Sequence, residues 1–326
     1  MKTVDLQYFP GWTRKAITFT MDDGNVTYDR IFIDMVRPYG IKGTMNLSSN
    51  NILKHHDPEG MRALYRGFEV TNHVKYHPYA FYDGEEPVAE QMAGEVFPGE
   101  NEADVELIYE ACEGVKGLCM RYSKDRGRWD KVATAEAYIA LTEACRSDLE
   151  AIFGEESVKG FVWPYHRQRN TRVIEYLKSQ YYGLRNAGGR VCYDDMTFAL
   201  PEDRSNWLYN ARHANLLERA ELFESLPDEG QLKWFAFGVH PIDFDRSENW
   251  DDLKEFCRRY GNRPEDYWYA TNIDIFRYED AVKSVVVSED SVTNPSDVDL
   301  YIKVGDTRVT LPAGCTIFIN ELLNLR

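Results

Sequence analysis

Residues 15–24, KAITFTMDDG, contain the pattern from which the fold of the whole chain can be predicted. A short segment, residues 15–20, has the character of a buried strand, and Asp22, Asp23 and Gly24 follow it after one residue, Met21. Two carboxylates beside a glycine indicate the point where such a strand ends and the chain turns. Taken alone, Asp-Asp-Gly is more often a plain turn than a functional site.

The same unit, an apolar segment followed by polar residues and then a helical pattern, recurs along the chain. The later predicted strands are residues 43–47, 68–71, 159–163, 182–185, 233–239 and 267–270. The predicted helices are residues 28–39, 58–66, 134–153, 171–179, 251–260 and 273–282. This alternation is typical of parallel βα units, so we expect an α/β fold, either an open doubly wound sheet or a closed barrel.

One long segment, residues 78–131, breaks this rhythm. It carries acidic runs, glycine and proline, and a connection of this length inside a compact domain is typical of a functional excursion. We expect a lid or rim insertion there, with partly helical content around Val105–Cys119. A decoration without function is the alternative.

The tail, residues 283–326, has a different character from the rest. Leu300, Ile302 and Val304 alternate with polar or charged neighbours, which predicts a small antiparallel β-module. The expected organisation is therefore a barrel over residues 1–282, which contains the insertion, followed by this module.

Composition excludes several classes of partner. The chain has 326 residues, 43% of them hydrophobic, and a formal net charge of −16. A protein this acidic repels phosphate backbones and anionic lipid. We therefore expect no nucleic-acid or membrane partner. The six cysteines form no C-x-x-C pair, which suits reduced thiols. The N-terminus has no apolar signal region, and we expect a cytoplasmic location.

Candidate polar side chains fall just past the ends of several predicted strands. In an α/β barrel the carboxyl ends of the strands share one face, so residues far apart in sequence converge there. The candidates on this face are Asp22, Asp23, His73, His77, Tyr165 and His240.

Two of these candidates have the spacing of a metal site. His73-x-x-x-His77 can present two imidazoles to one ion, and zinc accepts two histidines and a carboxylate while a fourth position stays open for water. Two surface histidines also occur at this spacing by chance. Val74 stands where an H-E-x-x-H metalloprotease has glutamate. His240 alone would more often be structural, and it gains weight from the convergence.

Together these residues resemble the motifs of the polysaccharide deacetylases, carbohydrate esterase family 4. The T-F-D-D-G motif of that family resembles residues 18–24, TFTMDDG, and its N-H-[ST]-x-x-H motif resembles residues 72–77, NHVKYH. Its third motif resembles FVWPY at residues 161–165, and its last, L-x-H, resembles GVH at residues 238–240. The order and spacing of the motifs cover about residues 12–282.

The resemblance implies a distorted (β/α)7 barrel with a mononuclear metal centre. The implied ligands of one divalent metal, zinc before cobalt, manganese or nickel, are Asp23, His73 and His77. The implied general base is Asp22 and the implied general acid is His240. The backbone N–H of Tyr165 is implied as a donor to the oxyanion.

Two positions of the family pattern lack a direct match. Val162 replaces the third-motif arginine that orients the base in many members, and either Arg185 or Arg167 is a candidate to substitute. The fourth-motif aspartate, which tunes the catalytic histidine, has three candidates, which are Asp195, Asp203 and Asp243.

The implied function is metal-dependent removal of acetyl groups from an N-acetylated amino sugar or a short oligosaccharide. A polymer is less favoured because a long insertion would narrow the groove. Two alternatives remain open at this point. One is an amidohydrolase of cyclic imides or ureides on the same fold, and the other is a sugar-binding relative without catalysis.

Overall fold

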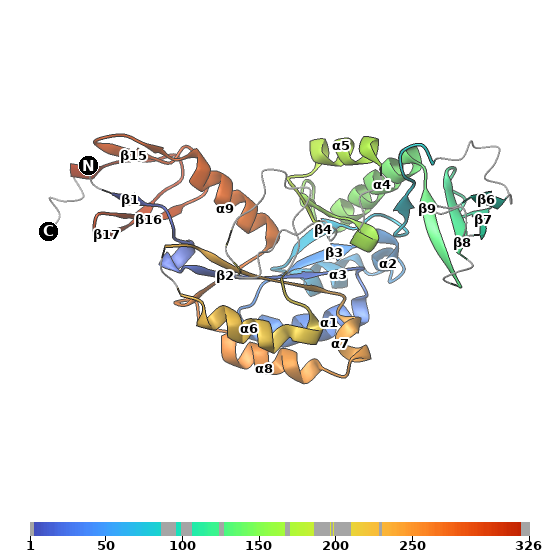
Figure 1. Cartoon of the computed structure of the whole chain (residues 1–326), viewed down its shortest axis with the longest axis horizontal. Helices are drawn as coiled ribbons and strands as arrows, with labels where there is room; N and C mark the ends of the chain where they lie inside the picture. Colours follow the sequence, from blue (N-terminus) through green and yellow to red (C-terminus); the bar gives the residue numbers. More distant parts are fainter. Residues whose placement is uncertain are drawn as a thin grey trace.

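The structure is a computed structural model that describes residues 3–85, 96–98, 106–123, 127–166, 170–185, 196, 198, 210–227 and 230–320. Three parts follow one another along its longest axis (Figure 1). A curved sheet with helices on both sides occupies the centre. A separate five-stranded sheet lies at one end, and small antiparallel sheets lie at the other, beside the N-terminal strand.

Seven parallel strands form the central sheet. Their spatial order is β11 (Gly183–Arg185), β10 (Gly160–Val162), β4 (Glu69–Asn72), β3 (Thr44–Leu47), β2 (Lys15–Met21) and β12 (Lys233–Val239), with β13 (Tyr267–Ala270) also paired to β2. One edge of β2 pairs with β12 along its whole length. The other edge pairs first with β13 and then, from Thr20 on, with β3. The sheet therefore curls into an incompletely closed barrel, and the predicted α/β fold with a distorted barrel is confirmed.

Helices cover both sides of this sheet. They are α1 (Val26–Val36), α2 (Ser49–Leu53), α3 (Pro58–Tyr65), α4 (Ala135–Phe153), α5 (Thr171–Gln180), α6 (Leu216–Ser225), α7 (Ile242–Arg246), α8 (Trp250–Tyr260) and α9 (Asn272–Ser284). Helices α1, α6 and α8 lie on one side and α4 and α5 on the other (Figure 1). Within the described ranges, no helix combines the length and the apolar character needed to cross a lipid bilayer.

The core is centred on β2 and β12. All seven residues of each strand are buried, which explains why β12 is an almost continuous apolar run. In β2 the buried hydroxyls of Thr18 and Thr20 accept hydrogen bonds from Trp234 and Asn46. Phe19 of β2 packs against Phe237 of β12 and Phe256 of α8, with ring centroids 4.9 and 5.3 Å apart. Full burial of such a side chain stabilises a fold by about 1.5–3 kcal/mol. This aromatic layer therefore holds the helices against the strands whose ends carry the candidate residues.

The insertion forms a sheet of its own. Its strand order is β5 (Tyr79–Ala80), β9 (Arg128–Ala133), β8 (Leu118–Ser123), β7 (Glu106–Ala111) and β6 (Val96–Pro98). We expected partly helical content around Val105–Cys119. For the described part of that segment this expectation is wrong, because it forms a β-hairpin. Glu113 and Gly114 have φ of 54° and 66°, and this left-handed pair reverses the chain between the two strands.

The tail folds as the antiparallel β-module that its alternation predicts. β16 (Leu300–Val304) pairs with β17 (Thr307–Leu311), and β15 (Ser291–Thr293) pairs with β14 (Val286–Val287) and β18 (Thr316–Phe318). β16 also pairs with β1 (Val4–Asp5), a strand from the start of the chain that the sequence pattern did not indicate. Leu300, Ile302 and Val304 are buried in one apolar cluster with Phe9 and Trp234. The module therefore shares this cluster with the barrel.

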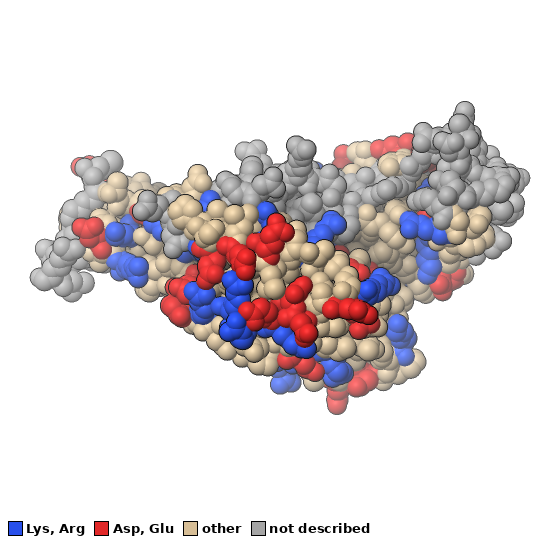
Figure 2. Space-filling view, turned by 60° about the horizontal axis from the view of Figure 1, so that its bottom comes forward, with Lys and Arg blue, Asp and Glu red and all other residues tan. Residues whose placement is uncertain are grey.

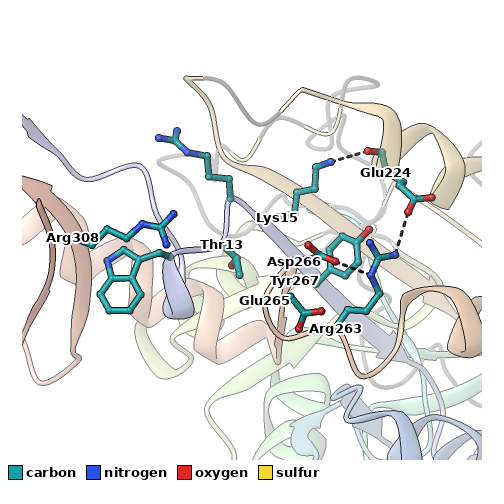
Figure 3. A pocket seen from close by; sticks show the side chains of 10 residues that line it. Thr13, Lys15, Glu224, Arg263, Glu265, Asp266, Tyr267 and Arg308 are labelled. Atoms are coloured by element: carbon teal, nitrogen blue, oxygen red, sulfur yellow. Dashed lines mark hydrogen bonds and ion pairs between the residues drawn. The ribbon is translucent and has the colours of Figure 1, made fainter. Parts of the chain in front are cut away.

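Charged residues at the amino ends of the strands pair with one another. Acidic and basic side chains interleave over α6 and α8 (Figure 2). A polar pocket of about 340 Å³ lies beside them, at the start of β2 and β13 (Figure 3). Lys15 donates to the carbonyl of Glu224 at 2.8 Å, and Arg263 pairs with Glu224 and Asp266 at 3.1 and 2.7 Å. In barrels this end of the strands contributes to stability.

Candidate metal centre and active site

Asp23, His73 and His77 form a compact cluster just past the carboxyl ends of β2 and β4. Their ligand atoms lie within 4.8 Å of one another. Nε2 of His73 and Nε2 of His77 are 3.0 Å apart, and Oδ1 of Asp23 lies 3.4 and 3.3 Å from them. Ligands bonded at about 2.05 Å to a tetrahedral zinc lie roughly 3.3 Å from one another. The observed separations therefore match the edges of a coordination tetrahedron.

The hydrogen bond made by His73 tests whether these residues suit a metal. Its Nδ1 lies 2.8 Å from the carbonyl oxygen of Val162, which can only accept, so Nδ1 carries the proton and Nε2 carries a lone pair. That lone pair faces Nε2 of His77 and Oδ1 of Asp23, a buried oxygen with no hydrogen-bond donor among the described residues. Three electron-rich atoms this close repel one another unless a cation lies between them. The cluster therefore fits a divalent metal ion.

The electrostatics of the cluster favour the protonation states that ligands need. Burial and the neighbouring His73 lower the pKa of His77 to about 3, so its imidazole is neutral. Burial raises the pKa of Asp23, but the interactions with His73, His77 and His240 outweigh it and bring that pKa down to about 2. A neutral imidazole and an ionised carboxylate are the forms that coordinate a metal.

Backbone strain is concentrated at this cluster. Asp23, Val74, Tyr76 and His77 have φ of 79°, 59°, 66° and 56°. Few residues other than glycine adopt this left-handed conformation, and a β-branched residue such as Val74 is a clear outlier. Strain of this kind persists only where the surroundings over-determine the backbone, and it is typical of functional sites.

Asp22 is anchored by buried partners beside this cluster. It is 2% exposed, and its Oδ1 accepts hydrogen bonds from Arg185 and from Nδ2 of Asn46, the latter at 2.6 Å. Arg185 is the last residue of β11 and is itself buried. It therefore contacts Asp22 as the missing third-motif arginine was expected to do. Arg167, the other candidate, lies outside the described residues.

His240 follows β12 and faces Asp23 across the mouth of the barrel. Its Nε2 lies 3.8 Å from Oδ2 of Asp23, and its Nδ1 lies 2.8 Å from Oδ2 of Asp243. Burial opposes protonation of this imidazole, but the hydrogen bond to Asp243 and the charges of Asp23 and Asp22 raise its pKa to about 9. Asp243 thus occupies the place expected of the fourth-motif aspartate. Asp195 and Asp203 lie outside the described residues.

Tyr165 follows β10 and closes the site on the side of the insertion. Its backbone is left-handed, with a φ of 55°. Its ring contacts the ring of His77 at a centroid distance of 4.5 Å and stacks on Tyr79 at 3.9 Å. The structure therefore brings all six residues singled out in the sequence to the same mouth of the barrel.

Comparison with known families identifies the chain. Residues 11–184, more than half of the sequence, match the family model for polysaccharide deacetylase. The chain belongs to the polysaccharide deacetylase family. As a member of this family it is a metal-dependent hydrolase of acetylated sugars, and the cluster of Asp23, His73 and His77 is its metal-binding triad. Comparison with curated proteins gives no match.

Several solved structures resemble this polysaccharide deacetylase. A peptidoglycan deacetylase from Bacillus subtilis is 12% identical, with a TM-score of 0.42 over 83% of this chain and 94% of that one. A Streptococcus mutans CE4 esterase is 12% identical, with a TM-score of 0.45 over 79% and 86%. A family 4 acetyl xylan esterase from Clostridium thermocellum is 12% identical, with a TM-score of 0.40 over 80% and 89%.

A small pocket of about 190 Å³ lies beside the deacetylase triad. It is strongly polar, because carboxylates, amides, an imidazole and two cations line it. The lining residues are Asp22, Asp23, Asn25, Asn51, Lys54, His240, Ile242 and Arg246. A substrate in this pocket would contact the anchored carboxylate and the imidazole together.

The residues that hold the triad in place were missed by sequence reasoning. They lie at the start of α2, directly after β3. The hydroxyl of Ser48 donates to the carbonyl of His73, Oδ1 of Asn50 accepts from the N–H of Tyr76, and Nδ2 of Asn51 donates to the carbonyl of Asp23. These bonds satisfy the strained backbone at 2.7–3.0 Å. The run Ser48-Ser49-Asn50-Asn51 just past a strand end was the signal that could have found them.

Proposed function

We propose that this polysaccharide deacetylase removes acetyl groups from an N-acetylated amino sugar or a short oligosaccharide of such sugars. The observation that carries the proposal is the presence of three chemically distinct groups at one mouth of the barrel, where Asp22, Asp23 and His240 line one pocket. These are the anchored carboxylate of Asp22, the metal-fitting triad and the imidazole of His240 held by Asp243. Amide hydrolysis needs a base, an electrophile and an acid in this order.

The metal that we propose for Asp23, His73 and His77 is zinc, because two imidazoles and one carboxylate form a ligand set that zinc prefers. Cobalt, manganese and nickel are the alternatives, since the same ligands accept them. A bound divalent ion lowers the pKa of water toward neutrality and polarises the acetyl carbonyl.

The protein's own groups then move the protons. Asp22, fixed by Arg185 and Asn46, takes a proton from the attacking water. The backbone N–H of Tyr165 donates to the oxyanion of the tetrahedral intermediate. His240, protonated and oriented by Asp243, gives the proton on Nε2 to the departing amine nitrogen. Acetate and the free amino sugar are the products.

The size of the pocket supports a small substrate. The part of the site beside Asp22 and His240 measures about 190 Å³, below the roughly 300–1,000 Å³ that is usual for drug-sized ligands. Tyr79 of the insertion lies against Tyr165 at the edge of the site, so the sheet that carries it bounds the cleft on that side. Both features favour one sugar ring, or a short chain, over the middle of a long polymer.

Acetate release from N-acetylglucosamine oligomers of graded length, with added zinc or cobalt, tests this proposal. We expect turnover that a chelator removes, and His73→Ala should lose both the bound metal and the activity. Cyclic imides and ureides serve as comparison substrates. Hydrolysis of the imides without acetate release would overturn the proposal, as would sugar binding without any turnover by protein that carries one metal per chain.

A further inference from the structure

The insertion sheet contributes a side chain to the immediate surroundings of the triad. Tyr79, the first residue of β5, stacks on Tyr165 with ring centroids 3.9 Å apart and an angle of 15° between the ring planes. Tyr165 in turn contacts the triad residue His77. Tyr79 is 3% exposed whereas Tyr165 is 37% exposed, so the ring of Tyr165 is partly open to solvent and has Tyr79 packed against one of its faces.

Tyr79 is held in place by the sheet that carries it. Its register partner is Val132 of β9, so Asp130 and Arg128, which lie two and four positions earlier, are on the same face as Tyr79. Nη2 of Arg128 donates to the Tyr79 hydroxyl at 3.4 Å, and Nε of Arg128 lies 3.0 Å from Oδ1 of the buried Asp130. The ring is therefore placed mainly by its strand pairing, because a hydrogen bond of 3.4 Å to its hydroxyl adds little.

Tyr165 needs such support because its backbone is strained. A non-glycine residue with a φ of 55° stays in that conformation only where packing determines it. Proline precedes it, which gives the segment no backbone donor at position 164. The stacked ring of Tyr79 is the aromatic contact that the insertion makes with this strained residue.

We propose that Tyr79 is a positioning residue for deacetylation, whose ring holds Tyr165 in the left-handed conformation that presents its backbone N–H to the oxyanion. This inference rests on the proposed function, in which that N–H is the oxyanion donor. It gives the insertion a role in the chemistry itself. The insertion is then part of the active site and not only a wall of the cleft.

Variants of Tyr79 separate the ring from its hydroxyl. Removal of one oxyanion donor lowers kcat by about 10²–10³, so displacement of the donor by Tyr79→Leu should lower kcat roughly tenfold or more. KM should stay within about twofold, because the oxyanion contact exists only in the transition state. Tyr79→Phe keeps the ring and should retain kcat within about twofold. An undiminished kcat in Tyr79→Leu would overturn the proposal, as would an equal loss in Tyr79→Phe.

A matched control lies on the same sheet. Trp129 of β9 is 43% exposed, packs against Tyr122, and alternates with Arg128 and Asp130, so it faces away from Tyr79. Trp129→Leu should leave kcat and KM at wild-type values. If it lowers kcat as much as Tyr79→Leu, the effect belongs to the stability of the sheet and the positioning role is wrong.

A spectroscopic readout tests the stack without any turnover. In metal-free protein labelled with 3-fluorotyrosine, the ¹⁹F resonance of Tyr165 is assigned by its loss in Tyr165→Phe. We expect it to move in Tyr79→Leu, because the ring current of the stacked partner is gone, and to move little in Tyr79→Phe. A resonance that does not move in Tyr79→Leu refutes the positioning role. Failure of the wild type to release acetate refutes the proposed function instead.

A second variant covers the case in which Tyr79→Leu does not fold. Tyr165→Leu removes the same stack from the partly exposed side and keeps the backbone N–H. It should show the same loss in kcat with KM nearly unchanged. A folded Tyr165→Leu protein with wild-type kcat would overturn the proposal.

Discussion

At the scale of single residues, the backbone lets two adjacent carboxylates take different roles. Asp22 is buried with Arg185 and Asn46, whereas the side chain of Asp23 is 38% exposed and lies against His73 and His77. The left-handed backbone of Asp23, with a φ of 79°, turns the chain between the two. Asp23 is thus placed in the metal-binding triad, and Asp22 is left as the base that we propose for proton transfer.

The first prediction separates these two residues. Asp22→Asn should keep the metal and lower kcat by roughly two to four orders of magnitude, the usual contribution of a positioned acid or base. Asp23→Asn should instead weaken metal binding, with activity partly rescued by excess ion. Metal content by elemental analysis and kcat at saturating substrate are the measurements. Loss of metal from Asp22→Asn but not from Asp23→Asn would show that the two roles are reversed.

The second prediction concerns Asp29, a carboxyl of α1 that lies in the core. It is fully buried, and the hydroxyl of Tyr65 donates to its Oδ2 at 2.7 Å. Burial raises its pKa to about 8, although the bond from Tyr65 opposes the shift. An unfolded aspartate has a pKa near 4, so between about pH 4 and pH 8 folding binds a proton. Stability should therefore fall as the pH rises through this window, by at most about 1.4 kcal/mol per pH unit.

Asp29→Asn gives the measurement, because an amide stays neutral at every pH. Urea unfolding of both proteins from pH 5 to pH 9 should show a fall in the wild type that the variant lacks, and the difference should level off above about pH 8. Equal pH dependence in the two proteins would contradict the protonated state of Asp29.

At the scale of elements, the start of the short helix α2 holds the backbone of the metal triad by hydrogen bonds. Its first residues bond the backbone of Asp23 and of the segment that carries both histidines. Supporting partners of this kind commonly change metal affinity by 10–100-fold when removed. We therefore expect this five-residue helix to contribute to the metal affinity of the site.

The third prediction follows from these hydrogen bonds. Asn50→Ala removes the acceptor for the N–H of Tyr76, so the left-handed turn before His77 loses a 2.7 Å bond. Zinc affinity, measured by competition with a chromogenic chelator, should fall about 10–100-fold. Asn262→Ala is the control, since Nδ2 of Asn262 donates to the carbonyl of Pro38 at 3.2 Å, a side-chain bond to the backbone away from the triad. Equal zinc affinities in the two variants would show that α2 does not support the metal site.

Strand ends could be predicted from the sequence because buried parallel strands are apolar and the residues past them are not. That contrast placed Asp22, His73 and His240 at one mouth. The contact between Asp22 and Arg185 joins residues 163 positions apart and depends on how far the sheet curls, which no local pattern records. The insertion was misjudged for a related reason. Its hairpin depends on two left-handed residues, and hydrophobic periodicity does not register backbone handedness.

At the scale of the whole molecule, the β-module stabilises the barrel through a shared apolar cluster. Leu300 is 0% exposed and lies in an apolar cluster with Phe9, Trp234 and Ile275, which belong to the barrel and its helices. The cluster lies apart from the larger core beneath the active site. The module should therefore affect unfolding without touching the chemistry.

The fourth prediction tests that separation. Leu300→Ala should lower the free energy of unfolding by about 2–5 kcal/mol, the usual cost of such a core truncation, and should leave kcat unchanged below the melting temperature. Val287→Ala, at a position of the same module that is 49% exposed, should change stability by no more than about 0.5 kcal/mol. Denaturant unfolding and acetate release give the two readouts. A fall in kcat without a fall in the free energy of unfolding would contradict the separation of the module from the chemistry.

The pairing of β1 with β16 has a consequence for biosynthesis. Val4 has Val304 as its register partner, and the two lie 300 positions apart. A ribosome that adds about 5–20 residues each second needs roughly 15–60 s to make the partner after the first strand has emerged. During that interval β1 has no neighbour, and the apolar side chains that follow it, such as Phe9, have no module to cover them. The nascent chain therefore exposes the unpaired edge of β1 until β16 has been made.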